Sequence, residues 1–458
     1  MTAQARKRRG ADDQAASGEE RQSTEQPVSW LELFFDLIFV TAFDRLAQRL
    51  LDHPSLSTFG VFTLLFVALW WAWLGNTSFA ARSGNIGRAY RWGTLAQMLA
   101  LAALAVSVRG DLSDVGAFFA LAYAAGRVIL ILMLVMHGRR DRGRQEGGAG
   151  LSSGDRTLVK GFGAGASLWV ASAFLEGPAQ LTLWGLALAC DLHAALTAEA
   201  RHDRDLPHQA HFPERVGLLL IVFLGAVVTE LIRAAAEQRL TVQGQAPAAL
   251  ALVTIMAIWR LYFDEAHTLP ALLAGRSGRV GTLLAWTYTH LPLMLGLSLL
   301  SVGIGLGVAE EGAAADRRER LLVGAALAVV FVCLTLLRAF SVTPLRAGVR
   351  REGGRRGAGQ PASAPGEPLP TVVGRAGLSV RQPLLGLSGV ARLGGAAALL
   401  LLMPAPIGTL GYQTICAGVT LAVAYLGWRD PVRGQLAQIE EDLHQDSEEA
   451  QAEDADRT

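Results

Sequence analysis

The sequence predicts an all-α membrane protein, a polytopic bundle of about twelve transmembrane helices. Of its 458 residues, 51% are hydrophobic, and these are gathered into long blocks that are separated by charged loops. Most blocks reach the roughly 20 residues that a helix needs to cross a bilayer. The formal net charge of +1 gives no sign of a nucleic-acid partner, so the expected surroundings are the lipid bilayer.

Blocks of about 18 to 25 mainly apolar residues mark the expected spans in chain order. They lie at 30–50, 57–80, 92–109, 114–136, 158–175, 179–198, 212–234, 247–266, 281–308, 320–341, 389–404 and 408–428. The first is charged, the sixth contains Asp191 and His193, and the eleventh is short and ends at Pro404 and Pro406. These are the least regular of the expected helices.

Basic residues are enriched in every second connection, and such loops stay on the cytoplasmic side of a membrane. The sets are Arg6, Lys7, Arg8 and Arg9 before the first block, Arg82, Arg88 and Arg91 after the second, Arg139, Arg140, Arg142 and Arg144 after the fourth, Arg201 and Arg204 after the sixth, Arg276 and Arg279 after the eighth, and the run from Arg346 to Arg381 after the tenth. The pattern predicts that both termini are cytoplasmic.

Composition divides the chain into five parts. A polar N-terminal segment (1–28) has no apolar signal region and is expected to be disordered, so the first span should be retained. The main bundle (29–341) is followed by a flexible linker rich in Arg, Gly and Pro (342–388). A final helix pair (389–428) and an acidic cytoplasmic tail (429–458) complete the chain.

The first block carries three carboxylates. Glu32, Asp36, Val40 and Asp44 recur at every fourth position, which places them on one stripe of a helix. A charge that faces lipid near the helix centre costs about 2.5 to 3.5 kcal/mol. The stripe should therefore face a helix bundle or a wet cavity, and it is the leading candidate for a functional site.

Further charged and histidine side chains lie inside or beside the other blocks. Those selected for a transport or proton site are Arg127, Asp191, His193, Glu214, Arg260, Asp264 and His290. Arg127 sits within an apolar run and needs a partner, for which Asp36 or Asp191 is the natural candidate. Such a pair can serve transport, or it can pin helices together at on the order of 1 kcal/mol per contact.

Asp36 is suited to load and release a proton, since burial and a nearby arginine act on it in opposite directions. His193 and His290 can extend such a relay, or they can be packing residues that donate a hydrogen bond to a neighbouring helix. No residue pattern calls for a cofactor. The sequence has neither a glycine-rich phosphate loop in a convincing context nor a serine nucleophile elbow.

His202, His208 and His211 resemble a cytoplasmic metal site only loosely, because their spacing matches no established ligand pattern. We interpret that segment as a solvated loop. The three cysteines lie in separate hydrophobic blocks, and we interpret them as packing residues with no disulfide or metal role: Cys190, Cys333 and Cys416.

Several segments together resemble the bacterial low temperature requirement protein A family. They are Trp30-Leu-Glu-Leu-Phe-Phe-Asp-Leu-Ile-Phe-Val, Tyr90-Arg-Trp to Met98, His211-Phe-Pro-Glu-Arg-Val-Gly-Leu, Trp259-Arg-Leu-Tyr-Phe-Asp264 and Tyr288-Thr-His-Leu-Pro-Leu, within residues 28 to 310. The resemblance implies a multi-pass protein of the bacterial plasma membrane, in a family named for a cold-growth phenotype and without an established activity.

The chain departs from that family at one point, because Gly225 is followed by Ala226 where the family commonly carries a glutamate. Glu230, one helical turn further on, can reach a neighbouring point of the same cavity or simply mark the outer end of its helix. The first and seventh blocks also echo one another, as Glu32-Leu-Phe-Phe-Asp and Glu214-Arg-Val-Gly-Leu show. Two six-helix repeats are one interpretation, and similar apolar composition is the other.

The functional hypothesis is a proton-linked secondary transporter or ion-conducting protein, with Asp36, Glu32 and Arg127 at its centre. Its substrate would be a small molecule or an ion. A membrane-embedded enzyme acting on a lipid or isoprenoid, with the same carboxylates and His290 as acid and base, is the alternative. A structural or regulatory membrane protein, whose polar residues only assemble the bundle, is the third hypothesis.

Overall fold

The computed structural model is built of long α-helices, and the residues it describes contain no β-strand. It describes residues 28–52, 55–83, 87–108, 112–144, 151–201, 211–238, 241–264, 268–271, 273, 280–309, 313–356, 386–439 and 441–442. Every predicted block coincides with one of these helices, because the apolar blocks are long and are bounded by charged or Gly/Pro-containing loops.

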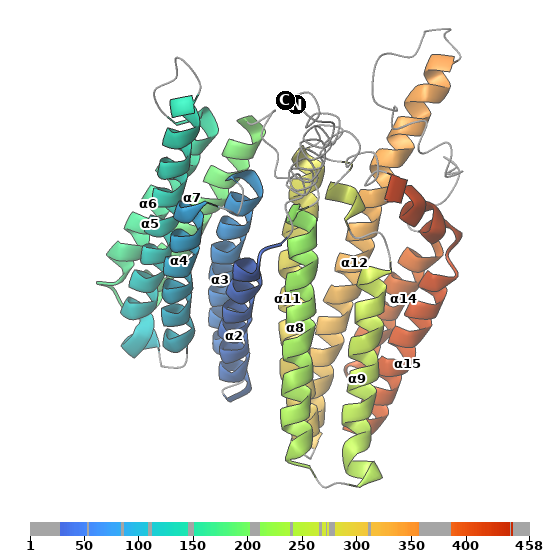
Figure 1. Cartoon of the computed structure of the whole chain (residues 1–458). Helices are drawn as coiled ribbons and strands as arrows, with labels where there is room; N and C mark the ends of the chain where they lie inside the picture. Colours follow the sequence, from blue (N-terminus) through green and yellow to red (C-terminus); the bar gives the residue numbers. More distant parts are fainter. Residues whose placement is uncertain are drawn as a thin grey trace, which may run out of the picture.

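The first helices gather on one side of the molecule (Figure 1). They are α2 (Trp30–Asp52), α3 (Leu56–Ser83), α4 (Arg88–Ser107), α5 (Leu112–Arg144), α6 (Ser153–Ser172) and α7 (Gly177–Arg201). In this N-terminal group α2 packs on α3 and α4. After that the helices pack in sequence, α4 on α5, α5 on α6 and α6 on α7.

The remaining helices form a C-terminal group on the other side (Figure 1). They are α8 (His211–Ala236), α9 (Val242–Phe263), α11 (Val280–Ala309), α12 (Ala313–Arg356), α14 (Gly386–Leu402) and α15 (Thr409–Trp428). Here α8 packs on α9 and α11, α11 on α12, α12 on α14, and α14 on α15. These contacts follow the same order as those of the N-terminal group.

The two groups meet where α2 and α3 contact α8 and α11. Large aromatic side chains fill this region, and Phe39, Phe66, Trp70 and Trp286 are almost completely buried. Burial of an aromatic ring contributes several times more contact area than burial of a small aliphatic side chain, so these rings dominate the packing. The centre of the molecule is therefore the boundary between the groups.

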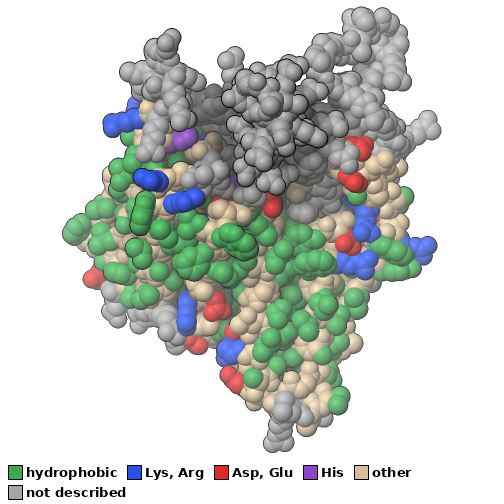
Figure 2. Space-filling view, in the orientation of Figure 1, with side chains coloured by type: hydrophobic (Ala, Val, Ile, Leu, Met, Phe, Trp, Pro, Cys, Tyr) green, Lys and Arg blue, Asp and Glu red, His purple; other side chains and the backbone are tan. Residues whose placement is uncertain are grey.

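The outer surface has the character of a lipid-facing surface. Among the described helices, eight are long and apolar enough to cross a membrane: α3, α5, α7, α8, α9, α11, α12 and α15. Large apolar side chains such as Leu99, Met256 and Leu401 are mostly exposed, and Figure 2 shows hydrophobic side chains spread over both groups on the viewed face. Charges buried inside and apolar residues outside indicate a multi-pass membrane protein.

Several expectations concern the ends of the predicted parts. α12 continues to Arg356, beyond the start of the predicted linker at 342, and 357–385 lies outside the described residues. The residues up to 27 and from 443 onward also lie outside them. The predicted tail begins with a short helix at 431–439, of which Val432, Leu436 and Ile439 are buried.

Candidate functional site

The acidic stripe of α2 faces the interior of the molecule. Glu32 and Asp36 have no exposed surface, Val40 is buried and Asp44 is half-buried. Leu37, on another side of the helix, is 53% exposed. The carboxylates thus avoid the cost of facing lipid, and the partners that compensate for their burial must come from neighbouring helices.

A basic pair on α8 supplies those partners. His211 and Arg215 lie one helical turn apart at the start of α8, and both are buried. The two Nη atoms of Arg215 lie 3.3 Å from Glu32 Oε1 and 3.3 Å from Asp36 Oδ1. His211 Nε2 lies 3.3 Å from Glu32 Oε1. An i, i+4 acidic pair on α2 therefore faces an i, i+4 basic pair on α8.

Polar side chains from α3 and α4 complete this constellation. Trp73 Nε1 donates to Asp36 Oδ1 at 2.7 Å, and Arg215 Nη1 donates to Asn76 Oδ1 at 3.2 Å. Asn76 Nδ2 in turn donates to Gln97 Oε1 at 2.7 Å. We call this set the Arg215 cluster: Glu32, Asp36, Trp73, Asn76, Gln97, His211 and Arg215.

One oxygen of the Arg215 cluster stands out. Asp36 Oδ2 is buried and has no hydrogen-bond partner among the described residues, whereas Asp36 Oδ1 accepts from Trp73 and Arg215. Buried carboxylate oxygens are normally satisfied, so an unsatisfied one indicates a bound water, ion or proton. The chemistry available at Oδ2 is the binding and release of a proton without loss of the two bonds to Oδ1.

A second buried ion pair lies within the N-terminal group. Arg127 Nε on α5 lies 3.0 Å from Asp191 Oδ2 on α7, and both side chains are buried. Arg127 Nη2 also donates to the Tyr123 hydroxyl at 2.6 Å, and its guanidinium carbon lies 5.1 Å from the centre of the Phe162 ring. Of the two partners predicted for Arg127, the structure selects Asp191, while Asp36 pairs with Arg215.

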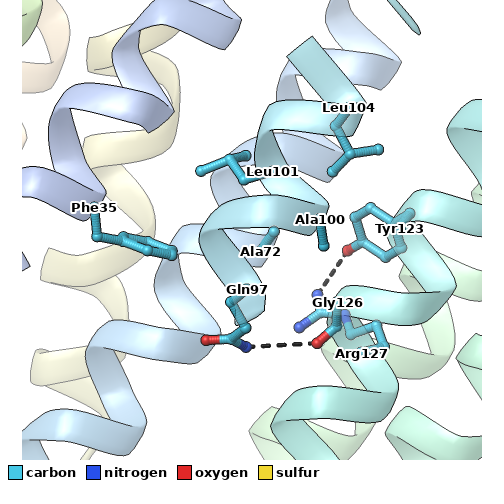
Figure 3. Close-up of a pocket in the computed structure, with 9 residues that line it drawn as sticks. All are labelled: Phe35, Ala72, Gln97, Ala100, Leu101, Leu104, Tyr123, Gly126 and Arg127. Atoms are coloured by element: carbon cyan, nitrogen blue, oxygen red, sulfur yellow. Dashed lines mark hydrogen bonds between the residues drawn. The ribbon is translucent and has the colours of Figure 1, made fainter. Parts of the chain in front are cut away.

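A small cavity lies between the two arginine sites (Figure 3). Its volume is about 30 Å³, and both Gln97 and Arg127 line it. Gln97 Nε2 reaches the Gly126 carbonyl at 3.5 Å, as the dashed line in Figure 3 marks. The lining of the cavity is mainly apolar, and the polar side chains that line it are those of Gln97, Tyr123 and Arg127. A space of this size holds about one or two water molecules. Gln97 belongs to the Arg215 cluster and Arg127 to the Arg127–Asp191 pair, so the cavity borders both sites.

The other residues selected from the sequence lie outside the Arg215 cluster and the Arg127–Asp191 pair. His193 and Glu214 are exposed, and Arg260 pairs with Asp264 at 2.9 Å at the end of α9. His290 is buried, 2.9 Å from the Tyr262 hydroxyl and 2.8 Å from the Trp286 carbonyl. The sequence signals at these positions do not distinguish a surface charge or a local hydrogen bond from a site residue.

Sequence reasoning assigned His211 to a solvated loop, and this is wrong, because His211 is buried against Glu32 as the first residue of α8. His202 and His208 lie outside the described residues. Within the described part, no three His, Cys, Asp or Glu side chains are grouped so as to hold a metal ion.

Arg215, Asn76 and Trp73 were not selected from the sequence. Arg215 follows His211 by four residues and opens an apolar run, which is the one local signal of a buried basic pair.

The family described as "Bacterial low temperature requirement A protein (LtrA)" matches residues 27–424. The chain belongs to the LtrA family. This match confirms the resemblance and extends it to α15. All residues of the Arg215 cluster fall within the matched range.

One relative is the protein named "Uncharacterized protein RA0937" of Rhizobium meliloti (strain 1021). It is 24% identical over 294 residues, which cover 62% of this chain and 70% of the relative. No solved structure matches the chain. The LtrA assignment and the apolar helices place this protein in a bacterial membrane.

Proposed function

We propose that this LtrA protein is a proton-linked secondary transporter or ion-conducting protein, and that the Arg215 cluster is its proton site. The observation that carries the proposal is the fully buried Asp36, which keeps one oxygen without a hydrogen-bond partner while Arg215 and Trp73 hold the other. Ionisable residues inside a membrane bundle commonly mark ion and proton pathways. The position of the cluster between two helix groups favours movement over a purely local role.

The proposal includes an arrangement of twelve spans in two six-helix repeats, with both termini in the cytoplasm. The repeated order of helix contacts supports it, because α2, α3 and α4 have the same relations as α8, α9 and α11. The facing i, i+4 pairs at the starts of α2 and α8 support it further. Parallel repeats with a central site between them are a familiar transporter architecture. α2, α4, α6 and α14 would be the four additional spans.

Asp36 would act by gaining and losing a proton. With Asp36 ionised, Arg215 bridges the carboxylates of α2 and ties α8 to it. Protonation at Oδ2 removes the negative charge of Asp36, so its ion pair with Arg215 becomes a weaker bond between a cation and a neutral acid. The tie between the two groups then loosens, which is the step that couples proton binding to a rocking motion.

The enzyme alternative requires acid and base groups at a lateral opening. A groove of about 950 Å³ does open between α8, α9 and α15. Its lining is apolar apart from Arg260 and Tyr425, and neither His290 nor the Arg215 cluster lines it. The groove offers room for a lipid tail without the chemistry to transform one, so the geometry favours transport.

The test is proton flux into liposomes that hold the reconstituted protein and a pH-sensitive dye, driven by a potassium gradient and valinomycin. We expect flux in the wild type and its loss in Asp36→Asn, because the amide keeps an acceptor for Trp73 but cannot exchange a proton. Glu214→Gln is the matched control, since this carboxylate is exposed next to Arg215, and it should retain flux.

Equal flux in the wild type and in folded Asp36→Asn would contradict the proposal, and so would a loss of flux in Glu214→Gln. Gel filtration in detergent establishes that each variant is folded before reconstitution. Variants must be compared at equal protein-to-lipid ratio, because background proton leakage scales with membrane area.

A further inference from the structure

A second polar site lies further along α2, two helical turns beyond Asp36. Asp44, at the end of the acidic stripe, lines a cavity of about 20 Å³ together with Ser298 and Ser301 of α11. The other walls are apolar and come from α2 and α8: Val40, Phe43, Ala47, Phe223, Ala226 and Val227. A space of this volume holds about one water-sized particle.

The two serines point to a ligand. Ser298 and Ser301 are 5% and 7% exposed, and both line the cavity. Neither hydroxyl has a hydrogen-bond partner within the described part of the chain. Nearby threonines, by contrast, donate to a carbonyl one turn back in their own helix, as Thr289 does to Ala285 at 2.7 Å. Hydroxyls that line a cavity without a protein partner are available to a particle that binds through oxygen.

The charges around the cavity favour a single positive charge. Glu230 of α8 is the acidic neighbour of Asp44, but Arg233 binds Glu230 at 2.6 Å and neutralises it. Arg45 also acts on Asp44, and its guanidinium is directed to Gln48 at 3.4 Å. Gln48 Nε2 donates to Asp44 Oδ2 at 3.0 Å, so the carboxylate already has one partner on its own helix. One carboxylate with two hydroxyl oxygens suits a hard cation of low charge that prefers oxygen ligands.

Aromatic rings separate this cavity from the Arg215 cluster. Phe43 lies between Asp36 and Asp44 on α2, with ring centroids 4.3 Å from Phe66 and 4.8 Å from Phe223. Phe39 packs on the other side of Phe43 at 4.5 Å. Phe43 and Phe223 also line the cavity, so these rings form its apolar wall. Hydrophobic constrictions hinder the passage of ions, and the Asp44 cavity is therefore a separate polar region from the Arg215 cluster.

We infer that Asp44, Ser298 and Ser301 form a binding site for Na⁺. In the transport cycle the site would hold the coupling ion opposite the proton site, and this role rests on the proposed function. Binding itself does not, since it requires only the cavity and its ligands. Gly305 of α11 allows the neighbouring Glu230 to lie close, because an added Cβ there would meet Glu230 Oε1 at 2.8 Å.

The test is thermal unfolding of the purified full-length protein in detergent, titrated with NaCl against choline chloride at constant ionic strength. We expect a saturable rise in unfolding temperature with Na⁺, because a ligand that binds only the folded state stabilises it. Ser301→Ala should weaken the apparent affinity by about tenfold. Asp44→Asn should abolish the response, and Asp52→Asn, on the exposed end of the same helix, should retain it.

A Na⁺ response that is equal in Asp44→Asn and wild type would overturn the inference, as would no response in the wild type. If stabilisation instead follows acidity in Na⁺-free buffer and depends on Asp44, the site binds a proton and the Na⁺ assignment is wrong. Should Asp44→Asn fail to fold, Ser298→Ala together with Ser301→Ala decides the matter. Proton flux through Asp36 is measured separately, so the failure of either proposal leaves the other intact.

Discussion

Replacing Arg215 with Gln is expected to leave almost no folded protein in the membrane. The variant keeps Glu32 and Asp36 buried but removes the cation that both of them bind. Removing one partner of a buried ion pair costs about 3 to 5 kcal/mol, because the remaining charge is uncompensated. Asn76 Oδ1 also loses a donor. Fluorescence-detected gel filtration and thermal unfolding in detergent measure the effect.

Arg260→Gln is the matched control for Arg215→Gln, because it removes an arginine from an ion pair that is not buried. The side chains of Arg260 and its partner Asp264 are 48% and 31% exposed. Such a pair contributes only about 0 to 1 kcal/mol, so this variant should unfold near the wild-type temperature. Arg215→Lys should lie between the two, since a point charge cannot bridge two carboxylates as a guanidinium does. Equal stability of Arg215→Gln and wild type would show that the charges of α2 are compensated elsewhere.

Replacing Asp191 with Leu is expected to have an effect of similar size within the N-terminal group. It leaves Arg127 fully buried with the Tyr123 hydroxyl and the Phe162 ring as partners and without a carboxylate. The double variant Arg127→Leu with Asp191→Leu should recover much of the loss, because a well-packed apolar pair often replaces a buried ion pair without penalty. Thermal unfolding of the two single variants and the double variant forms a complete cycle.

Proton flux in the double variant then separates the two interpretations of Arg127. If the pair only pins α5 to α7, the double variant, whose stability has recovered, should conduct protons as the wild type does. If Arg127 takes part in a relay through Gln97 and the shared cavity, flux should fall although stability has recovered. A double variant that is less stable than both single variants would contradict the account of the pair as an isolated unit.

The sequence predicts the helices well because each apolar block is long and its charged flanks are distinct. It also predicts the inward direction of the α2 stripe, since the fourfold spacing of Glu32 and Asp36 is a property of one helix. The sequence does not predict which residue pairs with Asp36. Arg215 lies 179 residues away, and its charge stands beside Glu214 at the start of an apolar run, where a surface residue is equally expected.

The residues that sequence reasoning missed share a physical cause. Trp73 and Asn76 lie in α3 and act through hydrogen bonds to other helices, which no local sequence pattern predicts. Their roles follow from the packing of α3 against α2 and α8, which are tertiary contacts. Conversely, His193 and Glu214 lie close to apolar blocks in the sequence, yet their side chains point to the surface. A charged residue near an apolar block can be assigned to the interior only when the face of the helix that carries it is also known.

The claim that Asp36 exchanges a proton is tested most directly by infrared difference spectroscopy of the reconstituted protein during a pH jump. Protonation of a buried carboxylate produces a carboxylic acid carbonyl band, and this requires no knowledge of the transported substrate. We predict such a band on acidification in the wild type and in Glu214→Gln, and its absence in Asp36→Asn. A band that persists unchanged in folded Asp36→Asn would contradict the assignment of the proton to Asp36.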